Sequence, residues 1–167
     1  MPHNLYMGPI IKIHLVNLKP VSTNAMYDGY RKSVEYLKQE RQVDATVRKV
    51  RAGIEALMNS YDEKKHVVWV NMIVHSPDHS LFNKSGKRKG CISKRCIDLD
   101  NTIKTITDAV FYNIPTIDDS QARHFEIDEI LSKDEFFHVT YFIRLKDKEW
   151  HYSRKLEDLE TQILQSP

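Results

Sequence analysis

The stretch RCIDLDNTIKTITDAVFYNIPTIDDSQ, residues 95–121, carries the residues that decide both fold and chemistry. Two carboxylates, Asp98 and Asp100, stand two positions apart in it. If Asp98-Leu99-Asp100 ends a strand, alternation places both carboxylates on one face and Leu99 on the other. A helix is expected to follow from Asn101, because Asp100 or Asn101 is a good N-cap.

That helix has two distinct stripes. An apolar stripe at helical spacing is expected to be buried, and it contains Ile103, Ile106 and Val110. A polar stripe at spacings of three and four contains Asn101, Lys104 and Asp108. Lys104 therefore stands one turn from a carboxylate cluster, on a face that need not be buried.

A second acidic pair, Asp118 and Asp119, closes the stretch. Four carboxylates brought together would repel one another unless a cation neutralised them. Ligands that are all oxygen, without a thiolate, suit a hard divalent ion, and the sequence therefore predicts Mg²⁺ or Mn²⁺.

Composition indicates a single globular domain without a membrane span. The chain has 167 residues, of which 41% are hydrophobic and 29% charged. No apolar run approaches the roughly 20 residues of a membrane helix, and residues 1–19 lack the features of a signal peptide. Two cysteines, Cys91 and Cys96, make no disulfide framework. We therefore expect a soluble, cytoplasmic protein, associated with the nucleoid or acting in a phage-infected host.

The distribution of charge says more than the net charge of +2. A block just before the acidic stretch holds six cations and no acid: Lys84, Lys87, Arg88, Lys89, Lys94 and Arg95. A cationic loop beside a carboxylate metal site suits a phosphodiester substrate, because the loop neutralises phosphates while the metal acts on one of them. The pattern predicts a metal-dependent enzyme acting on nucleic acid.

The remaining chain predicts a sheet with helices on it. Alternation or apolar runs indicate strands at 10–16, 67–74, 91–98, 122–130 and 136–145. The 67–74 strand is nearly all apolar and is expected to be buried on both faces, with Trp69 in the core. Helical spacing between Tyr30 and Met58 fits one bent helix or two, and a last helix is expected near 156–163. The order indicates an α/β or α+β fold in one domain, residues 1–167, with a helix at about 149–165 as an appended element.

The motif D-L-D-N-x-x-K-x-x-x-D followed by D-D-S-Q resembles the signature of the RusA family of Holliday-junction resolvases. The match from Asp98 to Gln121 needs no gap. Upstream, Pro20, Ser22 and Asn24 resemble the family's P-x-S-x-N motif. Each motif alone is weak, but their order and spacing together are specific. The resemblance runs from the first strand to the last and leaves roughly the final twenty residues unmatched.

This resemblance implies a mixed sheet flanked by helices and a Mg²⁺-dependent endodeoxyribonuclease that resolves four-way junctions and related branched DNA by symmetric paired nicks. Asp98, Asp100 and Asp119 would hold one or two Mg²⁺, with Mn²⁺ as a substitute. Lys104 would offset charge in the transition state. Asn101 would orient a ligand carboxylate, and Asp118 is a supporting residue. The family also implies a homodimer. The charge of the basic block predicts that its six cations contact DNA.

One departure concerns Ile97, which stands where family members can carry a basic residue before the first aspartate. Contact with the junction near the cut would then be weaker or differently placed.

Other interpretations stay open. The carboxylates could form a solvated acidic turn, although an EF-hand calcium loop is excluded because Ile103 and Ala109 replace its glycine and glutamate. A zinc set of irregular spacing is conceivable, comprising His75, His79, Cys91 and Cys96. The chain could instead be a non-catalytic module that binds branched DNA with a structural metal, or a nuclease for flaps and nicked duplexes.

Overall fold

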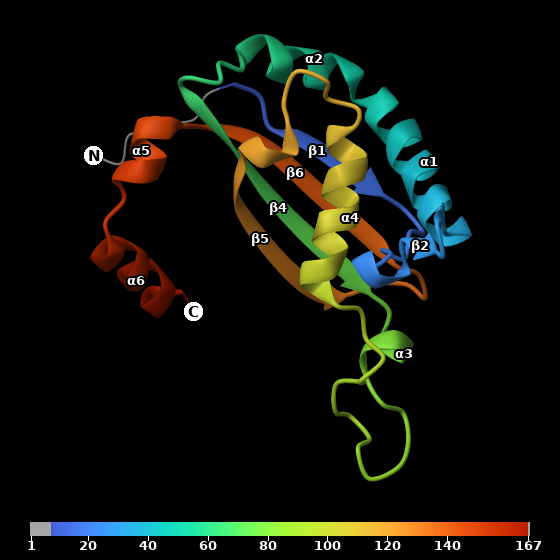
Figure 1. Cartoon of the computed structure of the whole chain (residues 1–167). Helices are drawn as coiled ribbons and strands as arrows, with labels where there is room; N and C mark the ends of the chain where they lie inside the picture. Colours follow the sequence, from blue (N-terminus) through green and yellow to red (C-terminus); the bar gives the residue numbers. More distant parts are fainter. Residues whose placement is uncertain (1–7, 167) are drawn as a thin grey trace.

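The computed structural model describes residues 8–166 and centres on a four-stranded mixed sheet (Figure 1). Its strands lie in the order β1-β6-β4-β5, namely β1 (Ile11–Leu15), β6 (His138–Asp147), β4 (His66–Ser76) and β5 (Ala122–Leu131). β6 is antiparallel to both β1 and β4, whereas β4 and β5 are parallel. The predicted fold class, an α+β domain built on a mixed sheet, is confirmed.

Three long helices cover one face of the sheet: α1 (Val34–Lys49), α2 (Arg51–Ser60) and α4 (Leu99–Phe111) (Figure 1). α4 supplies the crossover that two parallel neighbours, β4 and β5, require. The helical stretch left open between one bent helix and two is two helices, separated at Val50. Tyr30 was expected in it, but this residue is fully exposed in the turn between two short strands.

Shorter elements complete the chain. They are η1 (Thr23–Ala25), β2 (Tyr27–Asp28), β3 (Arg31–Lys32), α3 (Asp78–Leu81), η2 (Asp119–Gln121), α5 (Lys148–Ser153) and α6 (Leu156–Gln165). The extent of the domain over all of 1–167 stays a prediction, and the expectation about the N-terminal segment falls partly on residues 1–7, outside the described range. Within 8–166, no helix is long and apolar enough to cross a membrane.

The core lies between the helices and the face of the sheet that they cover. Alternation works as predicted in β1, where Ile11, Ile13 and Leu15 are buried. Burying such side chains contributes roughly 1.5–3 kcal/mol each. Tyr141 of β6 is fully buried, and its hydroxyl donates to Thr107 Oγ1 of α4 at 2.9 Å. The sheet therefore holds α4 by a directional bond as well as by apolar contact.

The opposite face of the sheet, which we call the open face, corrects the interpretation of β4 as buried on both sides. Trp69, Asn71, Ile73 and His75 alternate with the buried residues of β4 and are half-exposed. Trp69 was expected in the core, but it lies on the open face against α5, where its indole Nε1 donates to His151 Nδ1. The apolar run predicts which residues form β4, but it does not show whether helices cover one face of the sheet or both.

The strand expected at residues 91–98 is wrong. This segment forms turns, and the one β-bridge that it makes within residues 8–166 joins Ile92 to Phe82, outside the sheet. A strand needs a neighbour that accepts and donates its backbone hydrogen bonds, and this segment lies beyond the end of the sheet and pairs with none of its four strands (Figure 1).

Candidate active site

The acidic pair lies at the start of α4. Asp98 is the N-cap residue and Asp100 is in the first turn, so neither ends a strand as predicted. Both side chains are exposed. A helix N-terminus carries unpaired N–H groups and partial positive charge, which favours carboxylates there. The pair is therefore positioned by the helix rather than by alternation along a strand.

The carboxyl groups of Asp98 and Asp100 are neighbours, and their interaction moves their pKa values apart. The pKa of Asp98 is lowered, first by the neighbouring carboxyl of Asp100 and then by the hydrogen bond from the amide of Asn101. The pKa of Asp100 is raised by the same carboxyl neighbour. Each of two neighbouring carboxylates makes the negative charge of the other less favourable, and a bound cation would relieve this repulsion.

Asn101 joins both members of the pair. Its Nδ2 donates to Asp98 Oδ2 at 2.6 Å, and its backbone N–H donates to Asp100 Oδ1 at 3.0 Å. Its side-chain oxygen is also occupied, because Thr23 Oγ1 donates to Asn101 Oδ1 at 2.7 Å. A chain of hydrogen bonds thus runs from Thr23 in η1 through Asn101 to Asp98.

Thr23 is a residue that the sequence did not single out. It stands between Ser22 and Asn24 of the upstream motif but 78 positions from Asn101, so no local pattern relates the two. A buried contact fixes this segment, since Thr105 Oγ1 of α4 donates to the carbonyl of Val21. The one available signal was the adjacency of Thr23 to the P-x-S-x-N motif.

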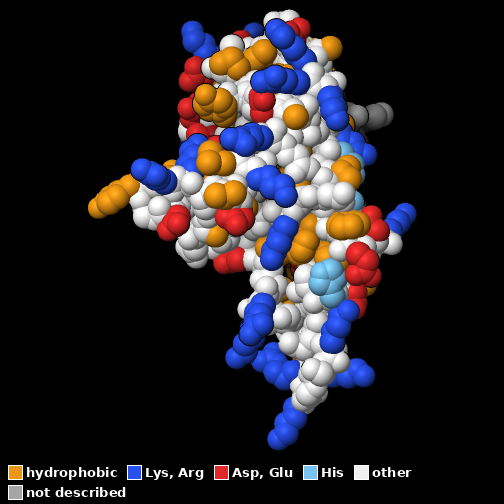
Figure 2. Space-filling view, turned by 90° about the vertical axis from the view of Figure 1, so that its right-hand side faces the viewer, with side chains coloured by type: hydrophobic (Ala, Val, Ile, Leu, Met, Phe, Trp, Pro, Cys, Tyr) orange, Lys and Arg blue, Asp and Glu red, His pale blue; other side chains and the backbone are white. Residues whose placement is uncertain are grey.

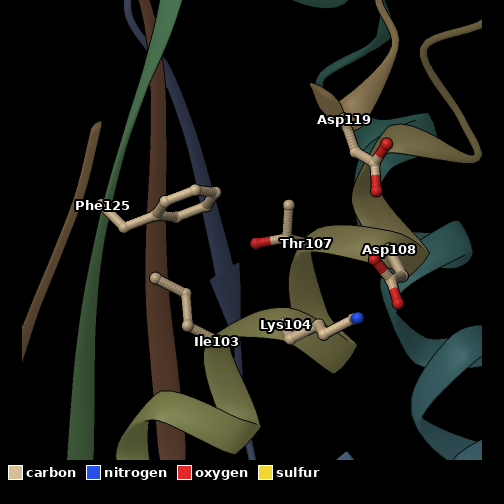
Figure 3. Close-up of a pocket in the computed structure, with 6 residues that line it drawn as sticks. All are labelled: Ile103, Lys104, Thr107, Asp108, Asp119 and Phe125. Atoms are coloured by element: carbon tan, nitrogen blue, oxygen red, sulfur yellow. The ribbon is translucent and has the colours of Figure 1, made fainter. Parts of the chain in front are cut away.

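Lys104 lies one turn along α4 from Asp100 and borders a cavity of about 260 Å³ (Figure 3). Asp108 and Asp119 line the same cavity, and Figure 3 shows both carboxylates on the side toward which Lys104 extends. Burial raises the pKa of Asp108, while the charge of Lys104 opposes this and that of Asp119 adds to it. Lys104 is exposed, as the polar stripe predicted.

Asp119 is thus placed with Lys104 and Asp108 rather than with the acidic pair. Asp100 and Asp108 are about 12 Å apart along the helix axis, at roughly 1.5 Å per residue. Over residues 8–166, no three His, Cys, Asp or Glu side chains are arranged so that they could hold a metal ion. This applies to the zinc set of His and Cys residues as well as to the three aspartates.

Asp118 caps η2 instead of facing the pair. Its Oδ1 accepts from the backbone N–H of Ser120 at 2.8 Å. Hydrogen bonds from Ser120 lower the pKa of Asp118. The geometry gives this carboxylate a local structural task.

Residues 77–97, which we call the basic arm, project from the end of the sheet beside the start of α4 (Figure 1). All six cations of the block are exposed, and Figure 2 shows Lys and Arg side chains extending from the arm in several directions. Its two sides are tied at the base, where Ser93 N–H donates to the carbonyl of Leu81 at 2.8 Å. A groove of about 680 Å³ at this base is lined by Lys84, Arg88, Lys94 and Arg95 among others.

An acidic pair at a helix N-terminus, a lysine one turn away and an adjoining cationic arm are features expected of a hydrolase that acts on nucleic acid. The comparison with family models makes this specific, because the model of Endodeoxyribonuclease RusA matches residues 18–144. The chain therefore belongs to the RusA family of endonucleases that resolve Holliday junctions, and the resemblance seen in the sequence is confirmed. A search of curated proteins finds no match. The matched segment includes η1, the basic arm and α4, and it ends within β6, before α5 and α6.

Proposed function

We propose that the chain cleaves four-way junctions and related branched DNA in a Mg²⁺-dependent reaction, as a homodimer that makes symmetric paired nicks. The observation that supports the metal dependence is the pair of exposed carboxylates at the start of α4, Asp98 and Asp100, both hydrogen-bonded to Asn101. Adjoining them is an arm with six exposed cations. We place this activity in the cytoplasm, where the DNA of a bacterial or phage-infected cell lies.

The protein's own groups divide the work. Asp98 and Asp100 would hold the ion, with Asn101 keeping the Asp98 carboxylate in place. A bound Mg²⁺ would lower the pKa of a water and stabilise charge on the attacked phosphate; Mn²⁺ can replace it. Lys104 would place a fixed positive charge where negative charge develops.

We keep Asp119 as a proposed third ligand on the family resemblance alone, because the structure places it beside Lys104 and not beside the acidic pair. This position gives Asp119 a testable alternative role. Asp119→Asn should abolish both Mg²⁺ binding and cleavage if the carboxylate binds the ion. Loss of cleavage with full Mg²⁺ binding would instead assign Asp119 to the orientation of Lys104.

The test is cleavage of a labelled synthetic four-way junction with and without Mg²⁺, beside a flap, a nicked duplex and a matched linear duplex. Asp98→Asn and Asp100→Asn keep the shape of each side chain and remove its charge, so each should abolish cleavage and retain junction binding. Asp44→Asn is the matched control, because Asp44 forms an ion pair with Arg48 on the surface of α1, where such a pair contributes little. Binding without cleavage by the unaltered chain in Mg²⁺ or Mn²⁺ would favour the non-catalytic module.

The basic arm supplies a second test. Neutralising Lys87, Arg88 and Lys89 together should weaken binding to all junction sequences alike, because these side chains meet phosphates rather than bases. The slope of log K against log salt should flatten by up to ~0.9 for each lost phosphate contact. An unchanged slope would show that the arm points away from the DNA.

A four-way junction has approximate two-fold symmetry, and two copies would place one site on each of two opposite strands. Light scattering with and without DNA measures the number of chains. A monomer that still makes both nicks in one binding event would refute the dimer and leave the nuclease intact.

A further inference from the structure

The two helices that follow the family-matched segment differ in how they are attached. α5 is fixed to the open face, where Trp150 packs on Trp69 with ring centroids 5.6 Å apart and His151 is buried. Arg154, the first residue after α5, lies over both tryptophan rings at 5.1 and 5.5 Å and donates from Nε to the carbonyl of His151 at 2.8 Å. The connection to α6 is therefore held at its root.

α6 itself has no buried residue among Leu156–Gln165, all of which the structure describes. Figure 1 shows it apart from the body of the domain, on the side of the edge strand β5. Leu156, Ile163 and Leu164 are 68%, 73% and 84% exposed, and with Leu159 they form an apolar stripe. A ten-residue helix is marginal alone in water, and its N-cap, Lys155, makes no side-chain capping bond. Packing against another surface would supply the missing stability.

The negative charge of α6 limits the kinds of surface that could cover its apolar stripe. The segment from Leu156 to the C-terminus contains Glu157, Asp158 and Glu160 and no Lys, Arg or His. A helix of this charge is repelled by DNA phosphates and by anionic lipid. The surface that covers α6 should therefore be partly apolar and carry positive charge.

The open face of the sheet has that character over β1 and β6. Lys12 lies 6.0 Å from the ring centroid of Phe142, and half-exposed Ile73 and Arg144 stand nearby on the adjoining rows. The acidic side chains of this face, Glu126 and Asp128, stand on β5. α6 leaves the domain on the β5 side, and its fixed two-residue connection leads it away from its own β1–β6 region.

We propose that α6 packs across the open face of a second copy of this chain, over β1 and β6, and that the exchange is reciprocal about a two-fold axis. In this arrangement the acidic side chains of α6 meet the cations of β1 and β6, and the apolar stripe of α6 covers Phe142 and Ile73. This inference rests on the homodimer of the proposed function and assigns its contacts to a segment outside the family match. The occupant is a second copy, and packing on the chain's own sheet is the outcome that would contradict it.

The experiment is sedimentation of the full chain over a range of micromolar concentrations, without DNA or Mg²⁺, so that it is independent of nuclease activity. Leu159→Asp combined with Ile163→Asp places charge in the apolar stripe and should raise the dimer dissociation constant at least about tenfold. Thr161→Asp adds one negative charge on the opposite side of α6 and should change the dissociation constant little. A chain ending at Lys155 retains Arg154 and should behave like the double variant.

Amide hydrogen exchange separates the second copy from packing within one chain. Protection of α6 amides should rise with protein concentration if a second copy covers the helix. Concentration-independent protection in a monomeric chain, or a double variant that associates as tightly as the unaltered chain, would overturn the proposal. A monomer at every concentration would do the same, while junction cleavage would still decide the nuclease assignment on its own.

Discussion

Replacing Thr23 with valine removes one hydroxyl and keeps the shape of the side chain, so it isolates the hydrogen bond to Asn101. That bond spans 2.7 Å and holds the amide that donates to Asp98. A neutral hydrogen bond contributes about 0.5–1.5 kcal/mol. If all of it serves to position Asp98, the single-turnover cleavage rate should fall about two- to tenfold, at about 1.4 kcal/mol for each factor of ten.

The assay is single-turnover cleavage of a four-way junction at saturating enzyme, repeated over a Mg²⁺ titration. A positioning role predicts a lower rate, a higher Mg²⁺ midpoint and unchanged junction affinity. Thr23→Ser keeps the hydroxyl and should restore both values. In an Asn101→Ala background the valine substitution should have no further effect, because the contact is already gone. Equal losses in the serine and valine variants, or an additive loss in that background, would refute the reasoning.

Three further predictions test the site and the fold. Lys104→Ala should lower the cleavage rate by about 10²-fold with little change in binding, as measured by kinetics beside a binding titration; a parallel loss of affinity would make this lysine a plain phosphate contact. Tyr141→Phe removes the buried bond to Thr107 and should lower the free energy of unfolding by about 0.5–1.5 kcal/mol in a denaturant titration, and no loss would show that the bond is not stabilising. Burial holds the pKa of His14 and of His75 below 6.5, so the unfolded chain binds more protons as the pH falls through about 6.5 and stability should fall there. His75→Gln should flatten that fall in thermal unfolding at pH 7.5 and 5.5, and an unchanged slope would assign it to other groups.

The sequence predicted correctly those helices and strands that have a clear periodic pattern in their own residues. β1 and α4 show clear alternation or helical spacing, and the structure has both close to the predicted bounds. The false strand at 91–98 had local alternation but no neighbouring strand, which local patterns do not reveal. The second face of β4 was misjudged because an apolar run does not reveal how many layers cover a sheet, and here the six-residue helix α5 packs against Trp69 while the rest of this face of β4 stays half-exposed.

The candidate site likewise contains one arrangement that the sequence predicted and others that depend on the tertiary structure. The position of Lys104, one turn from Asp100, follows from helix geometry and could be predicted from the sequence. The hydrogen bond from Thr23 depends on how η1 packs against α4, and the position of Asp119 depends on where the chain after α4 turns back. Both contacts depend on the tertiary structure. Spacing along the chain could suggest Thr23 and Asp119 as residues near the site, but it could not predict which groups they contact.

The base of the basic arm has a consequence for how such enzymes can diverge. The bond between Ser93 and Leu81 closes the excursion, so the chain enters and leaves the arm at one place. Between these ties, length and composition can change without displacing the start of α4, because loop closure costs little for each added residue. We expect the arm to be exchangeable as a cassette: another sequence grafted between Asn83 and Ile92 should alter which branched DNA is preferred and leave the chemistry of bond cleavage as it is.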